Sequence, residues 1–169
     1  NKFMSNIQEE IKLNASKVDA YLNSYFKNQN SNSKLYEAMK YGLFSGGKMI
    51  RSYLVHAACK VFDIKEKDYI PIAAAIECVH SYSLIHDDLP SMDNDDFRRG
   101  KESTHKAYGE FTAILAGSSL LTMAFEMISD HNFKIPDEKK TKIIHALSFC
   151  SGHLGIAGEI GRASCRERV

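Results

Sequence analysis

Apolar residues recur at spacings of three, four and seven along most of the chain, which is the pattern of amphipathic helices. A first stripe runs from Ile7 to Tyr25 and ends at the polar stretch NQNSNS. Ser33 can cap a second helix whose apolar positions reach Leu43, where the stretch SGGK ends it. A third helix is expected from Ile50.

Proline marks both ends of a fourth expected helix. Pro71 suits its first turn, and Pro90 removes a backbone donor and disfavours helical geometry at Leu89, so the helix should end near Asp88. Two separate helical patterns follow, HKAYGEFTAILAG and SLLTMAFEMISD, and another begins after Pro136 with DEKKTKIIHALSFC. No segment alternates with period two over a useful length. The chain is therefore predicted to be all-α, an antiparallel helical bundle with short loops.

Composition agrees with one folded domain: 169 residues, of which 44% are hydrophobic and 25% charged. The net charge of +1 implies no general basic surface and by itself argues neither for nor against a nucleic-acid partner; none is expected. No apolar run approaches about 18 residues and no leader is recognised, so we expect no membrane span and a cytoplasmic location. The four cysteines, Cys59, Cys78, Cys150 and Cys165, lie far apart without a C-x-x-C pair, and the first three fit helical patterns as small apolar residues.

The stretch SLIHDDLPSMDNDDFRRGK carries the most unusual charge pattern. Five aspartates lie within ten positions and basic residues follow at once: Asp87, Asp88, Asp93, Asp95, Asp96, then Arg98, Arg99 and Lys101. A helix C-terminus already bears partial negative charge, so carboxylates there need a cation. Mg²⁺ suits oxygen ligands without cysteine and commonly bridges carboxylates to a phosphate. The alternative is an acidic loop that pairs with its own arginines.

Two further patterns indicate anion binding. His80 and Asp87 are seven residues apart and can face one cavity, although a lone histidine is more often a core residue. In GGKMIR, Lys48 and Arg51 are three apart on one expected helical face, directly after two glycines. Glycine permits close approach, and helix-start amides beside two cations can bind a phosphate, although a helix cap alone would explain the glycines. The combination predicts a cavity for two diphosphates.

These stretches resemble the trans-isoprenyl diphosphate synthase family (polyprenyl synthetases), in its bacterial farnesyl/geranylgeranyl diphosphate synthase branch. GGKMIR resembles the family motif G-G-K-x-x-R, DDLPSMD its first aspartate-rich motif, and RRGK the arginine pair that follows. The flanking helices, AAAIECVHSYSLIHDD and THKAYGEFTAILAG, are similar almost position for position. The resemblance covers about residues 33–161.

The resemblance implies a prenyltransferase that condenses isopentenyl diphosphate with dimethylallyl or geranyl diphosphate to a short-chain product, expected to be farnesyl diphosphate. It implies Mg²⁺ as the cofactor and a homodimer. The residues implied for the diphosphate of isopentenyl diphosphate are Gly47, Lys48, Arg51, His80 and Arg99.

The same resemblance assigns the allylic side of the site. Asp87 and Asp93 would ligate Mg²⁺, Asp88 would act with them, and Arg98 would contact the allylic diphosphate. Tyr82, five residues before Asp87, would limit chain growth; the alternative is an ordinary core tyrosine.

The chain also departs from the family pattern. Ser52 stands where the family usually has proline, and Ser118 where it usually has aspartate. After GIAGEIG the sequence reads RASCRERV, and no second aspartate-rich motif is present. We therefore expect residues 1–161 to be the N-terminal portion of a synthase domain, 162–169 to be an unrelated tail, and the chain alone to be inactive. The alternatives are a non-catalytic synthase-like subunit and an HD-type metal phosphohydrolase, suggested by the His-Asp pair in IHDD.

Overall fold

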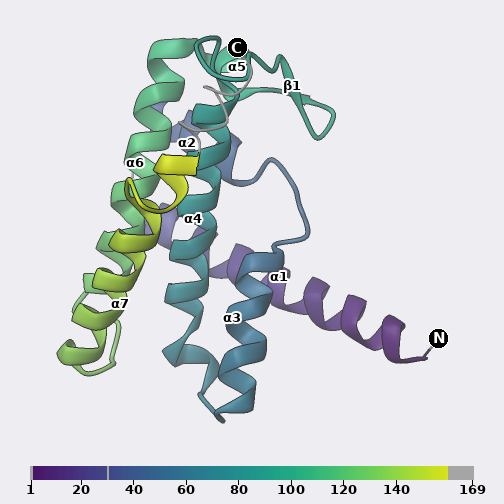
Figure 1. Ribbon diagram of the computed structural model, residues 1–169, viewed down its shortest axis with the longest axis vertical. Helices are drawn as coiled ribbons and strands as arrows, with labels where there is room; N and C mark the ends of the chain where they lie inside the picture. The colour runs from purple at the N-terminus through teal and green to yellow at the C-terminus, as the bar shows by residue number, and fades with distance from the viewer. Residues whose placement is uncertain (1, 30, 160–169) are drawn as a thin grey trace.

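Helices make up nearly all of the secondary structure in the computed structural model, which describes residues 2–29 and 31–159 (Figure 1). In chain order the elements are α1 (Lys2–Asn28), α2 (Lys34–Leu43), α3 (Ile50–Val61), the 3-10 turn η1 (Glu66–Asp68), α4 (Ile70–Asp87), β1 (Phe97–Arg98), β2 (Lys101–Glu102), α5 (Thr104–Tyr108), α6 (Glu110–Ser129) and α7 (Asp137–Ser151). The two short strands form one antiparallel pair. The all-α prediction is confirmed. The expected boundary between residues 161 and 162 lies outside the described residues.

Local sequence explains where α2 and α4 begin and end. Ser33 caps α2, since its Oγ accepts a hydrogen bond of 3.2 Å from the Tyr36 N–H. Pro71 lies in the first turn of α4, and Asp88 forms the C-terminal cap two residues before Pro90. Both predicted ends of α4 are correct to within one residue.

The helix break after Thr104 differs from the prediction. The chain breaks at Gly109, whose φ of +88° ends α5, and α6 then runs without interruption through Gly117. A Cβ at Gly117 would lie 2.4 Å from Nε2 of His86 on α4. Gly117 therefore permits close packing of two helices and does not end one.

Helices α4 and α6 form the centre of the bundle, and α1, α2 and α3 pack around them (Figure 1). Among the described residues α6 is the one helix long and apolar enough, by length and composition, to cross a membrane, so the prediction that no apolar run has this length is wrong. Eight of its residues are buried against its neighbours, among them Ala113, Leu120 and Met127. The apolar character of α6 fits its place in the core.

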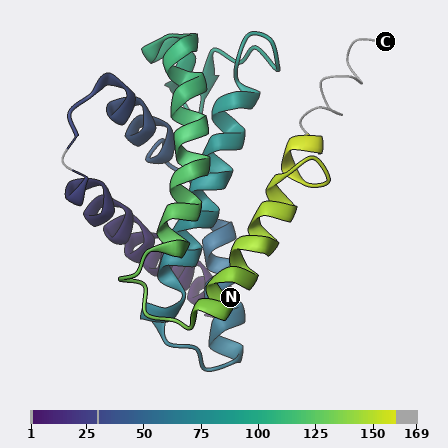
Figure 2. The same ribbon diagram turned by 90° about the vertical axis from the view of Figure 1, so that its left-hand side faces the viewer.

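Helix α7 packs on α6 near its start and leans away from the other helices toward its end (Figure 2). The three described cysteines are free thiols within helices: Cys59 on α3 is partly buried, Cys78 on α4 is buried and Cys150 on α7 is exposed. Burial raises the pKa of both the Cys59 and the Cys78 thiols. Cys165 lies outside the described residues.

Candidate functional site

One face of α4 lines a cavity of about 560 Å³ between this helix and the end of α7. His80, Ser83 and Asp87 contribute from α4, Asp93 from the turn that follows it, and Arg51 from α3. The opposite wall includes the apolar side chains of residues 149, 154 and 156. The predicted placement of His80 and Asp87 on one cavity is therefore correct.

Asp87 and Asp93 form what we call the acidic corner. The Asp93 N–H donates a 2.9 Å hydrogen bond to the Asp87 carbonyl, so the turn after α4 folds back and both side chains reach the same cavity. Burial raises the pKa of Asp87, the carboxylate of Asp93 raises it further, and Arg98 opposes them in part. Among the described residues no basic side chain forms an ion pair with either carboxylate, so these residues leave the negative charge of the corner unbalanced. Two hard oxygen ligands with excess charge fit a divalent cation, although the described residues contain no cluster of three or more potential metal ligands.

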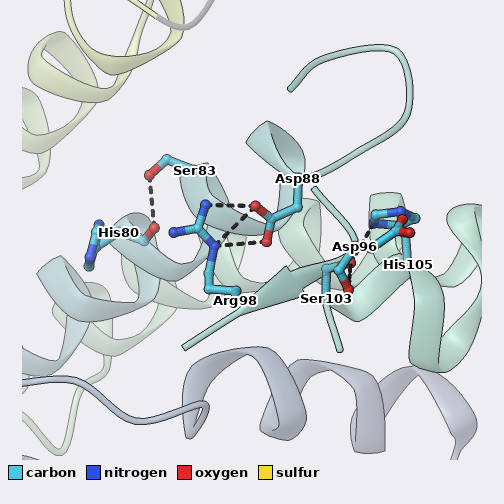
Figure 3. A network of polar contacts seen from close by, with 7 residues as sticks. All are labelled: His80, Ser83, Asp88, Asp96, Arg98, Ser103 and His105. Atoms are coloured by element: carbon cyan, nitrogen blue, oxygen red, sulfur yellow. Dashed lines mark hydrogen bonds and ion pairs between the residues drawn. The ribbon is translucent and has the colours of Figure 1, made fainter. Parts of the chain in front are cut away.

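Asp88 differs from its neighbour because it already has a cationic partner (Figure 3). Arg98 donates from Nε to Asp88 Oδ2 at 2.8 Å and from Nη2 to Oδ1 at 2.6 Å, and the Asp88 side chain is only 3% exposed. Lys106 similarly pairs with Asp96 at 3.2 Å. Pairing with internal cations thus occurs for two of the five aspartates. Contact of Arg98 with a diphosphate stays a prediction. Nη1 has no hydrogen-bond partner among the described residues, and Nη2 has a second N–H, so both could make it.

A second cluster, which we call the basic corner, consists of Lys48, Arg51, His80 and Arg99 around a pocket of about 90 Å³. Gly47 has a φ of +139°, and a Cβ there would lie 2.3 Å from Nη1 of Arg99. Only glycine lets this guanidinium rest on the loop.

The loop before α3 differs from the prediction in one respect. Helix α3 begins at Ile50, after Met49 in the left-handed region with a φ of 47°, so Lys48 lies in the loop and does not share a helical face with Arg51. The loop and the helix nevertheless place both cations on the same pocket.

His80 is neutral in this setting. Burial lowers its pKa to about 4, and the positive charges of Arg51, Arg99 and Arg98 contribute further. Nη1 of Arg51 lies 3.2 Å from Nε2 of His80. Because a guanidinium can only donate, Nε2 is the acceptor and the imidazole proton is on Nδ1. The basic corner therefore has excess positive charge and hydrogen-bond donors suited to a diphosphate.

Tyr82 lies on a different face of α4. Its ring packs edge-on against His86 at 4.9 Å, and His86 Nε2 lies 3.1 Å from the carbonyl of Ile114 on α6. Tyr82 is not among the described residues that line the cavity with Asp87. Its role in chain length stays a prediction.

Sequence reasoning missed two residues at the site. Glu77 lines the basic pocket and Ser83 lines the larger cavity, where its Oγ donates to the His80 carbonyl at 2.8 Å. An acidic residue within the otherwise apolar first part of α4, one turn before His80, was the signal for Glu77.

The fold and the two corners together define a class: an all-helical protein with one site suited to a divalent cation beside a second suited to a polyanion. The model of the polyprenyl synthetase family matches residues 32–159, so the chain belongs to this family. It is 41% identical over 142 residues to farnesyl diphosphate synthase of Bacillus subtilis (strain 168), an alignment that covers 83% of this chain and 48% of that protein.

Other relatives agree on the family and differ in product. A chloroplastic geranylgeranyl pyrophosphate synthase of Catharanthus roseus is 44% identical over 128 residues, 75% of this chain and 36% of that protein. The crystal structure of a geranyltransferase from Legionella pneumophila superposes with a TM-score of 0.92 at 36% identity, over 100% of this chain and 60% of that one. The chain spans about half or less of the length of these curated relatives.

Proposed function

We propose that the protein is a prenyltransferase that condenses isopentenyl diphosphate with an allylic diphosphate, dimethylallyl or geranyl, to a short-chain product, farnesyl diphosphate. The observation that carries the proposal is the pairing of an unbalanced acidic corner with an unbalanced basic corner along one face of α4. Two diphosphates, one bridged by metal and one held by arginine and lysine, would balance both. Two relatives are named farnesyl diphosphate synthase and geranylgeranyl pyrophosphate synthase, which supports the proposal.

Mg²⁺ is the proposed cofactor, and Asp87 and Asp93 would hold it. When bound, it would supply positive charge where the departing allylic diphosphate develops negative charge. The proposal is supported by the raised pKa of Asp87, which is caused first by burial and then by the neighbouring carboxylate of Asp93.

The chain's own side chains would carry the remaining steps. Lys48, Arg51 and Arg99 would bind the isopentenyl diphosphate, and neutral His80 would donate from Nδ1. An apolar cavity of about 410 Å³ adjoins the site between α4, α6 and α7, with Ile76 and Leu147 in its walls. It suits the hydrocarbon part of a substrate and would keep water from a carbocation.

Calorimetric binding to the purified chain tests this assignment. Isopentenyl diphosphate is expected to bind with and without Mg²⁺, whereas geranyl S-thiolodiphosphate, which resists ionisation, is expected to need Mg²⁺. Isopentenol, which lacks the diphosphate, is the control and should not bind. Equal binding of the allylic analogue with Mg²⁺ and with EDTA would overturn the assignment of the acidic corner.

Product formation separates this proposal from its alternatives. Release of diphosphate with a longer isoprenoid supports the transferase. Because the chain alone is expected to be inactive, binding without turnover agrees both with a transferase that lacks its second aspartate-rich motif and with a non-catalytic synthase-like subunit. An HD-type hydrolase has less support, because the histidine of IHDD is His86, which contacts α6 and not the cavity of Asp87.

We also propose a homodimer and a cytoplasmic location on the basis of family likeness. Sedimentation velocity should then give twice the mass of the chain. A monomer across the micromolar range would contradict the dimer.

A further inference from the structure

Three buried polar residues from three helices meet behind the basic corner: Asn14 of α1, Ser52 of α3 and Glu77 of α4. The exposed fractions of these three residues are 2%, 0% and 5%, respectively. Burying a polar side chain costs free energy unless the side chain is hydrogen-bonded, and a connected set of such bonds can hold neighbouring helices in place.

Ser52 is the centre of the connection. Its N–H donates to Glu77 Oε1 at 2.9 Å, its Oγ donates to the Met49 carbonyl at 2.8 Å, and Asn14 Nδ2 donates to the same Oγ at 3.1 Å. The Ser52 N–H belongs to the first turn of α3, where backbone donors have no partner within the helix. Met49, the capping residue, offers no side-chain acceptor. Glu77 thus caps α3 from a neighbouring helix.

The next residues on both helices are those of the basic corner. Arg51 directly precedes Ser52, and His80 follows Glu77 by one turn of α4. The 3.2 Å contact between Arg51 and His80 therefore runs beside the buried bond between Ser52 and Glu77. Arg51 is exposed, so packing does little to hold its side chain, and the start of α3 sets the position from which its guanidinium reaches His80.

We propose that Glu77, acting through the Ser52 N–H, is a positioning residue that sets the first turn of α3 against α4 and so places Arg51 on His80 and on the diphosphate pocket. Glu77 is the one acidic residue among the described residues that line this pocket, which makes a direct contact with an anion unfavourable. The ligand part of this inference rests on the proposed function; the coupling between Glu77 and His80 does not.

The matched pair Glu77→Gln and Glu77→Met tests the role of the acceptor. Both replacements have similar length, but only glutamine keeps an oxygen for the Ser52 N–H. The pKa of His80, measured by NMR titration, reports the position of Arg51 without any ligand, because the positive charge of Arg51 lowers that pKa. In Glu77→Met the pKa of His80 should rise by about one pH unit as Arg51 moves away, whereas Glu77→Gln should stay near the native chain.

The sign of this change separates positioning from charge. If Glu77 acted on His80 through a negative charge, its removal would lower the pKa of His80 in both variants. A fall in both, or no change in Glu77→Met, would overturn the proposal. A packing role alone would alter the melting temperature and leave the His80 titration in place.

Binding of isopentenyl diphosphate, measured by calorimetry, extends the test to the site. Glu77→Met should weaken binding about tenfold, since an unpaired buried donor disturbs the placement of Arg51, and Glu77→Gln should restore it to within about threefold. If the native chain binds no isopentenyl diphosphate but the His80 titration shifts as expected, the proposed function fails and the positioning role stands.

Two further variants secure the test. Ser52→Ala removes the hydroxyl but keeps the backbone N–H that donates to Glu77, so His80 should titrate as in the native chain. Should Glu77→Met not fold, Glu77→Asp takes its place: it keeps the charge but withdraws the oxygen by one methylene, and the His80 pKa should again rise. An unchanged His80 titration in a folded Glu77→Asp chain would contradict the proposal.

Discussion

The acidic and basic corners lie on one face of α4, yet the chain builds them differently. The acidic corner comes from a single local stretch, where the Asp93 N–H bonds the Asp87 carbonyl and the turn brings two carboxylates together. The basic corner needs three separate segments: the loop around Gly47, the start of α3 and Arg99 beyond β1. Short-range geometry is sufficient for the first, whereas the second depends on packing.

Among the described residues, neither corner contains an ion pair that would neutralise its charge. Burial and Asp93 raise the pKa of Asp87, and burial together with nearby arginines lowers the pKa of His80. These shifts have opposite sign and the same meaning, because each group is held in an environment unfavourable to its charged form. A ligand that neutralises either corner should therefore stabilise the fold.

The largest effect should come from the ion pair beside the acidic corner. Arg98→Met leaves the buried Asp88 carboxylate without its partner and should lower the free energy of unfolding by about 3 kcal/mol in urea denaturation. Lys106→Met removes the exposed partner of Asp96 and is the matched control, with an expected cost below about 0.5 kcal/mol. Equal costs would show that Asp88 is not held by Arg98.

The next effect concerns the acidic corner itself. Asp87→Asn removes one of two proposed ligands and should weaken Mg²⁺-dependent binding of geranyl S-thiolodiphosphate about thirtyfold, or about 2 kcal/mol. Binding of isopentenyl diphosphate should change little, since the basic corner is intact. Asp95→Asn, at a neighbouring exposed position, is the calorimetric control. Loss of both ligands in Asp87→Asn would mean that the corners do not act separately.

The sequence allowed the fold to be predicted where its signals are local. Ser33 and Pro71 mark helix starts through their own backbone chemistry. The predicted helix break at Gly117 is wrong, because the role of this glycine depends on its contact with His86, a residue from another helix. A glycine that permits helix packing and one that ends a helix look alike in a single sequence.

The same difference separates the two corners of the site. The i, i+7 spacing of His80 and Asp87 was enough to place them on one cavity. The contact of Arg99 with Gly47 spans a loop and a hairpin that no local pattern connects. Met49 adopts a left-handed conformation, which leaves Lys48 outside the helix. Because Met49 is not a glycine, its own residue type gives no sign of this conformation.

A smaller effect should come from the loop of the basic corner. Gly47→Ala places a methyl group where the Arg99 guanidinium lies and should weaken isopentenyl diphosphate binding about tenfold in calorimetry. Gly46→Ala is the matched control: its φ is also positive, at +89°, but a Cβ there meets no atom within 4 Å. If both variants weaken binding equally, backbone strain and not the displacement of Arg99 is the cause.

The smallest effect is a pH dependence that should change sign with Mg²⁺. A carboxyl whose pKa is raised on folding adds stability that is fully present below its unfolded pKa and is lost as pH rises through its folded pKa. In EDTA, the native chain should therefore lose stability relative to Asp87→Asn as the pH rises above about 4. The difference should stay below about 1 kcal/mol because the site is partly solvated.

Adding Mg²⁺ at neutral pH should reverse that order, since a cation that binds only the folded chain stabilises it and needs the Asp87 carboxylate. Urea denaturation of both chains, with Mg²⁺ and with EDTA, measures the reversal directly. If Asp87→Asn were the less stable chain in EDTA as well, Asp87 would have an internal partner. The acidic corner would then be balanced by the fold, and the contrast with the basic corner would disappear.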